Sequence, residues 1–161
     1  MTVTSVEPNF EDATLTVTID LDAPPEAVWD LIADPRKLER WWGPPSHPAT
    51  FERHELTPGG VATHFMTAPD GERFHGVWRV VSVDAPRALH VEDSFATPDG
   101  VVDPNLPATR MRVSITEAAG QTRLEITSTS ASKEDLEKLL EMGAAEGMRQ
   151  AFGQMDALLA E

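Results

Sequence analysis

A chain of 161 residues is long enough to bury a hydrophobic core but short for two domains, so its length predicts one domain. Its formal net charge of −14 repels phosphate backbones and anionic lipid headgroups, which argues against nucleic-acid and membrane-surface roles. It has no cysteine, no signal-peptide pattern and no apolar run near the roughly 20 residues that span a bilayer, so we expect a soluble cytoplasmic protein without disulfides or thiolate chemistry.

The N-terminal part of the chain predicts a tail followed by a strand. Residues 1–12 are expected to be a loosely held tail, and residues 13–161 a single domain. Within residues 13–21, apolar side chains alternate with threonine and aspartate, the pattern of a half-buried strand. The apolar positions are Leu15, Val17, Ile19 and Leu21.

Two short helices are expected after this strand. Proline at positions 24 and 25 is allowed in a first helical turn, and Glu26 is favourable near the positive end of a helix. Asp34-Pro35 ends that helix and begins another short one, which closes at the Trp-Trp-Gly-Pro-Pro of residues 41–45.

From residue 50 to residue 130 the sequence is a series of strands and turns. Proline–glycine and aspartate–glycine turns separate the apolar segments, and Pro69-Asp70-Gly71 is a strong hairpin signal. The loop over residues 97–107, with three prolines, is the longest. Six strands are expected, at residues 50–56, 61–66, 73–83, 89–95, 109–116 and 122–128.

The C-terminal segment changes to a helical period. Ser132 opens a Ser-Lys-Glu-Asp sequence that resembles a capping box, and apolar residues follow at helical spacing as far as Leu158. An unbroken helix here would be about 28 residues, or about 42 Å, long. We therefore predict an α+β fold in which one sheet is covered by one long helix.

Four stretches of the chain carry a resemblance to a known family. They are Ala23–Trp29, Asp34–Pro44, Leu56–Gly60 with Pro69–Gly71, and Gly76–Leu89. Together with the order of elements, they resemble the START-like (SRPBCC) superfamily, in the branch related to the activator of the heat-shock chaperone ATPase. The resemblance covers the chain from about Thr14 to its end.

The resemblance implies a helix-grip fold, a curved antiparallel β-sheet wrapped around a long C-terminal α-helix with two short helices after the first strand. Members commonly carry Gly-Trp in the terminal helix, where this chain has Gly147-Met148, and that departure affects the shape of the pocket. Glycine costs about 1 kcal/mol relative to alanine inside a helix. Close approach of the helix to the sheet, or space for a ligand, would offset this cost at Gly143, Gly147 and Gly153.

Aromatic residues supply the candidate ligand contacts. Trp41 and Trp42 suit a pocket rim, with the alternative that one ring belongs to the core and the other covers a helix end. Phe74 and Trp78 lie on one face of a strand and would line the cavity floor or be buried between layers.

Polar candidates are fewer. Asp93 shares strand parity with Phe95 and is expected to face the cavity, where desolvation raises its pKa, unless a bulge or an edge position lets it reach water. His64 and His75 lie on one predicted hairpin and would face each other. No histidine or carboxylate pair has metal-ligand spacing, and no nucleophile, phosphate-loop or dinucleotide motif is present, so we expect no metal, no cofactor and no assigned catalytic residue.

The predicted function is to bind a small hydrophobic molecule, as a carrier or sensor, between the sheet and the terminal helix. A cyclase, aromatase or hydrolase using Asp93, His64 or His75 in the same cavity is the first alternative, and a co-regulator of the chaperone ATPase is the second. A homodimer is compatible with this size. The predicted ligand-binding residues are Trp41, Trp42, His64, Phe74, Trp78, Asp93, Phe95, Met148 and Phe152.

Overall fold

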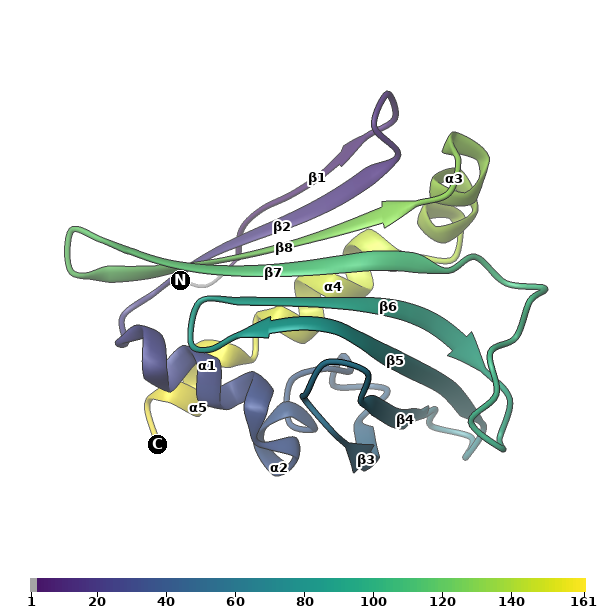
Figure 1. Cartoon of the computed structure of the whole chain (residues 1–161), viewed down its shortest axis with the longest axis horizontal. Coiled ribbons are helices and arrows are strands. Elements are labelled where there is room, and N and C mark those ends of the chain that lie inside the picture. The colour runs from purple at the N-terminus through teal and green to yellow at the C-terminus, as the bar shows by residue number, and fades with distance from the viewer. Residues whose placement is uncertain (1–2) are drawn as a thin grey trace.

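The computed structural model describes residues 3–161 and contains one eight-stranded antiparallel sheet with helices on one side of it (Figure 1). The order of strands across the sheet is β1-β2-β8-β7-β6-β5-β4-β3. The strands are β1 (Val3–Asn9), β2 (Thr14–Leu21), β3 (Ala49–His54), β4 (Val61–Thr67), β5 (Arg73–Asp84), β6 (Ala88–Ala96), β7 (Thr109–Ala118) and β8 (Gln121–Ser130). The predicted helix-grip fold class is confirmed, and the six strands expected between residues 50 and 130 are β3 to β8.

The N-terminal segment differs from the expected loose tail, because residues 3–9 form the edge strand β1. This strand pairs antiparallel with β2 from Asn9↔Thr14 to Val3↔Ile19, with a bulge between Val3 and Ser5. Val6 packs against the core. An edge strand that buries so little apolar surface carries a weak alternation signal, so the sequence pattern missed it. The remaining residues of the expected tail, 1–2, lie outside the described residues.

The two short helices are confirmed as α1 (Pro25–Ala33) and α2 (Pro35–Leu38). Helix α1 buries Val28, Leu31 and Ile32 against the sheet. Asp34 separates the helices, and its Oδ1 accepts a hydrogen bond from the backbone N–H of Arg36 at 2.9 Å. They connect β2 to β3, so they follow the second strand of the structure and the first strand of the prediction.

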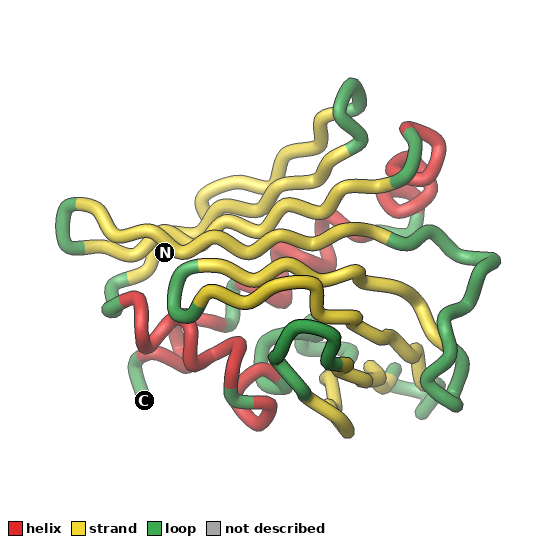
Figure 2. Tube along the Cα trace, viewed as in Figure 1, coloured by secondary structure: helices red, strands yellow, loops and turns green. Residues whose placement is uncertain are grey.

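The C-terminal segment is helical but it is not one continuous helix. It consists of α3 (Lys133–Glu141), α4 (Ala144–Phe152) and α5 (Met155–Leu159), shown as separate helical segments in Figure 2. Ser132 Oγ accepts from the Asp135 N–H at 3.1 Å, as the predicted cap requires. Gly143 has φ +88° and so breaks the segment, because only glycine readily adopts this left-handed conformation.

The core lies on the concave face of the sheet, between the strands and the helices. Helix α4 crosses behind the sheet in Figure 1; the main contacts of α4 and α3 with the sheet are to β1, β2 and β8, and α1 contacts β7 and β8. The centre of this layer contains Ile19, Leu124, Ile126, Val91 and Met155, all at most 2% exposed. Within residues 3–161, no helix is long and apolar enough to span a membrane.

Candidate functional site

An aromatic cluster forms the floor of the concave face near β3, β4 and β5. The Trp41 ring contacts Phe152 edge-on, with ring centroids 5.1 Å apart, and its indole N–H donates to the carbonyl of Leu31 at 2.8 Å. Trp42 contacts Trp78 edge-on at 5.0 Å. Trp41, Trp78 and Phe152 are buried, whereas Trp42 is half-buried. Of the tryptophan pair, Trp41 therefore belongs to the core, and Trp42 lies at its margin.

His64 is the buried titratable group of this cluster. Its Nε2 atom accepts a hydrogen bond from the Trp42 indole N–H at 3.2 Å. Because indole only donates, this bond places the His64 proton on Nδ1, and that atom is buried without a partner. Burial, with a smaller contribution from the charge of His75, lowers the pKa of His64 to about 3. The imidazole is therefore neutral at physiological pH.

A row of polar side chains crosses four neighbouring strands on the same face. Antiparallel register places Trp78 opposite Asp93, Asp93 opposite Thr109, and Thr109 opposite Ser130. Directly opposed residues point to the same side of a sheet, so these four side chains share the concave face with the core. The Trp78 Nε1 and Ser130 Oγ atoms are buried and have no hydrogen-bond partner. We call Trp78, Asp93, Thr109 and Ser130 the polar row.

Asp93 is the ionisable member of the polar row. It is half-buried, and burial raises its pKa from 3.8 to about 7. The carboxyl group is consequently about half protonated at neutral pH, so it can act as a hydrogen-bond donor and as an acceptor. Its exposure also indicates that the helices do not fully cover this part of the concave face.

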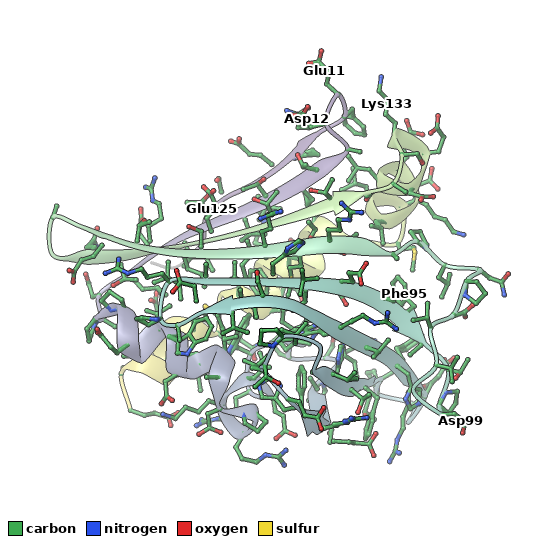
Figure 3. The ribbon with its side chains drawn as sticks, viewed as in Figure 1. Glu11, Asp12, Phe95, Asp99, Glu125 and Lys133 are labelled. Carbon is green, nitrogen blue, oxygen red and sulfur yellow. The ribbon has the colours of Figure 1, made fainter. Side chains whose placement is uncertain are left out.

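Apolar side chains continue beyond the polar row to the end of the sheet where β4 and β6 finish and β5 begins. Met66 lies opposite Phe74, and Phe95 lies opposite Gly76, all on the concave face. Phe74 is 47% exposed, and Met66 and Phe95 are half-buried. Figure 3 places Phe95 at the end of the sheet where the long β6–β7 loop begins. We call Met66, Phe74 and Phe95 the apolar strip.

Helix α4 faces the core with small and flexible side chains. Ala151 is buried, and the half-buried Met148 packs against the core. A β-carbon built at Gly147 would meet no heavy atom within 4 Å. The first explanation for the helical glycines, close packing of the helix on the sheet, is therefore wrong for Gly147. The structure has open space around this residue.

The predicted ligand-binding residues fall into three groups. Trp41, Trp78 and Phe152 lie in the core. Trp42, His64 and Asp93 adjoin Trp78 at the margin of that core. Phe74 and Phe95 lie in the apolar strip, and Met148 of α4 packs against the core.

The predicted pairing of His64 with His75 is wrong. His64 lies opposite Gly76, and His75 lies opposite Phe65, so the two imidazoles are on opposite faces of the sheet. Within residues 3–161, no group of three or more histidine and acidic side chains could hold a metal ion.

Sequence reasoning missed Met66, Gly76, Thr109 and Ser130. For Thr109 and Ser130 the signal was present, since both continue the buried alternation of their strands: Met111 and Val113 in β7, and Leu124 and Ile126 in β8. Gly76 could be recognised only from the structure, because its role depends on the ring of His64 above it.

The profile of a protein family described as Activator of Hsp90 ATPase homolog 1-like protein matches residues 22–160. The crystal structure of protein Ms6760 from Mycobacterium smegmatis is 44% identical, with a TM-score of 0.90, over 98% of this chain and 96% of that one. The solution structure of a protein from Arthrobacter aurescens is 43% identical, with a TM-score of 0.94, over 99% of this chain and 92% of that one.

A more distant relative shares the fold. The crystal structure of the AHSA1 protein from Silicibacter pomeroyi is 20% identical, with a TM-score of 0.74, over 92% of this chain and 98% of that one. No curated protein matches this chain.

Proposed function

This chain belongs to the family of Activator of Hsp90 ATPase homolog 1-like proteins, and on that premise we propose that it binds a small, largely apolar molecule on the concave face of its sheet. The molecule would lie against the apolar strip and the polar row, beneath α4. The observation that carries this proposal is the meeting of partly exposed aromatic side chains with unpartnered polar atoms on one face.

The apolar strip supports an apolar ligand body. Phe74 is 47% exposed although it lies on the same face as the buried Trp78, four residues further along β5. Complete burial of a side chain of this size contributes about 1.5–3 kcal/mol. A ligand that covers Phe74 and Phe95 would gain this free energy, and the flexible thioethers of Met66 and Met148 would adapt to its outline.

The polar row supports a ligand with one polar group. The buried indole N–H of Trp78 and hydroxyl of Ser130 have no partner, and each such group costs about 1–3 kcal/mol when it is left unsatisfied. A hydroxyl or carbonyl group of a ligand placed beside Asp93 would accept from Trp78. The preferred ligand is therefore amphipathic: an apolar body with a single uncharged polar group.

A second candidate function is catalysis of proton transfer on such a molecule. It is favoured by the pKa of Asp93, about 7, because a group with a pKa near the working pH is an efficient general acid or base. If a bound compound is turned over and Asp93→Asn abolishes turnover but not binding, the protein is an enzyme of this kind. Binding without turnover supports a carrier or sensor.

Fluorescence titration with the neutral probe N-phenyl-1-naphthylamine tests the binding site. We expect saturable binding that weakens about tenfold in Phe74→Ser and in Phe95→Ser, from the burial free energy of a phenyl group. Phe10→Ser is the matched control, since Phe10 is 44% exposed in the turn between β1 and β2. The proposal fails if no saturable binding occurs, or if Phe10→Ser weakens binding as much as the other two changes.

A further inference from the structure

The opposite, outer face of the sheet has a groove formed mainly by residues outside the concave site. It encloses about 950 Å³ and is bordered by strands β3 to β8 and by the first part of the β6–β7 loop, residues 99–102. Its floor includes Val77 and Arg79, which alternate along β5 with the core residues Trp78 and Val80. The groove therefore lies on the other face of the sheet from the core, although two residues of the polar row, Thr109 and Ser130, also border it. Figure 3 views the sheet from this side, with Asp99 labelled at the loop.

Two arginines of the groove form no ion pair with any acidic residue that the structure describes. Antiparallel register places Arg79 opposite Glu92, and Glu92 opposite Arg110, so the three side chains form one row across β5, β6 and β7. Within the described part of the chain, neither Arg79 nor Arg110 makes an ion pair. A third arginine of the groove, Arg53, forms an ion pair with Glu55, with 3.0 Å between Arg53 Nη2 and Glu55 Oε1.

The two arginines are distinguished by their position, because both border one groove of a chain that has 27 acidic and 13 basic residues. Two guanidinium groups that border one groove provide up to ten N–H donors for the oxygens of an anionic group. Glu92 and Asp99 also line the groove and would repel a second negative charge. These charges suit a single anionic group and oppose a polyanion such as nucleic acid.

The groove also has an apolar wall. Val77 lies on its floor, and Val101 and Val102 of the loop border it. Val101 is 61% exposed and Val102 is 46% exposed. A ligand with an apolar body would cover these valines while its charged group reached the arginines.

We propose that this outer groove binds a small organic anion, with a carboxylate, sulfonate or phosphate group held by Arg79 and Arg110 and an apolar body against Val77, Val101 and Val102. The arginines and valines of this site are not part of the site proposed on the concave face, although Thr109 and Ser130 border both. The two sites differ in charge preference: the outer groove requires an anion, and the concave face prefers an uncharged molecule.

A pair of probes separates the two sites. 8-Anilinonaphthalene-1-sulfonate and N-phenyl-1-naphthylamine share the same aromatic framework, and only the first carries an anionic group. In two-dimensional 1H–15N NMR titrations, we expect the sulfonate to shift the amide signals of residues 99–102 and of β5, and we expect the neutral probe to leave the loop signals unchanged. Raising the salt concentration should weaken the sulfonate-specific binding.

Charge-removing variants identify the arginines. Arg79→Gln and Arg110→Gln should each weaken the sulfonate-dependent shifts about tenfold, because each removes a charge-assisted contact. Arg112→Gln is the matched control: Arg112 is exposed two residues along β7 on the same outer face but does not border the groove. All three residues are on the surface, so the fold should be retained, which circular dichroism checks.

The proposal is overturned if the loop signals respond equally to both probes, if they respond to neither, or if Arg112→Gln weakens binding as much as the other two variants. Its failure leaves the concave site untouched, because that site is measured by the neutral probe and the Phe74→Ser variant.

Discussion

The His64 ring lies over Gly76 of the neighbouring strand so closely that a β-carbon at position 76 would be 2.6 Å from the Cε1 and Nε2 atoms of the ring. Phe51 stacks on the same imidazole, with ring centroids 4.7 Å apart. The ring thus has little room to move, and its orientation allows the hydrogen bond from Trp42. Gly76 is needed here for close approach, since its φ does not lie in the left-handed region.

Gly76→Ala should destabilise the protein by about 1–3 kcal/mol, because the new methyl group must displace the imidazole from a packed position. Chemical denaturation monitored by tryptophan fluorescence measures this change. In the background of His64→Ala, which removes the ring, the same glycine substitution should cost much less. If Gly76→Ala lowers the stability equally in the parent and in His64→Ala, the contact with the His64 ring is not the cause of the loss.

The pH dependence of stability should report the burial of His64. Its folded pKa of about 3 lies below the ordinary value of 6.5, so the unfolded state binds the proton more readily at intermediate pH. The contribution of His64 is fully present above pH 6.5 and is lost as the pH falls toward 3. We expect His64→Gln to reduce this acid-dependent loss by an amount on the order of a few kcal/mol.

His47→Gln controls for the loss of an imidazole, since His47 lies in the loop between α2 and β3 and is only half-buried. The free energy of unfolding is measured at pH 4 and pH 7 for both variants. If the loss of stability between these pH values is the same in His64→Gln and His47→Gln, the acid sensitivity does not come from His64.

Asp93 should produce the opposite trend. Its folded pKa of about 7 lies above the ordinary value of 3.8, so the folded state holds the proton more tightly than the unfolded state. This contribution is fully present below about pH 3.8 and is lost as the pH rises to 7. Asp93→Asn should therefore be more stable than the parent at pH 8, by on the order of 1–2 kcal/mol after allowance for partial solvent exposure, and about equal to it at pH 3.5. If the stability of Asp93→Asn differs from that of the parent by the same amount at pH 8 and at pH 3.5, burial does not raise the pKa of Asp93.

Two glycines of the C-terminal segment should respond in opposite directions to alanine. Gly147 lies inside α4 with free space around it, so Gly147→Ala should stabilise the protein by up to about 1 kcal/mol, raising Tm by roughly 2–4 °C. Gly143 has φ +88°, so Gly143→Ala should lower the stability by about 1 kcal/mol. Differential scanning calorimetry distinguishes the two cases. A lower Tm in Gly147→Ala than in the parent would mean that the space beside Gly147 is filled.

The fold class, the two short helices, the strand β2 and the six strands β3 to β8 could all be predicted from the amino-acid pattern. Alternation in β2 and turn residues such as Pro69-Asp70-Gly71 report local structure, and local structure is set mainly by a residue and its near neighbours in the chain. The parity of β6 also placed Asp93 on the face shared with the core, because side chains alternate strictly along a strand.

Three other features depend on contacts between segments that are distant in the chain. The tertiary structure paired β1 with β2, because an edge strand is stabilised by backbone hydrogen bonds that leave little trace in its side chains. It put His75 on the face opposite His64, because the register of a hairpin depends on both strands and a shift of one residue reverses every side chain. It divided the terminal helix at Gly143, since a glycine tolerated within a helical pattern becomes a break only when packing favours a left-handed conformation there.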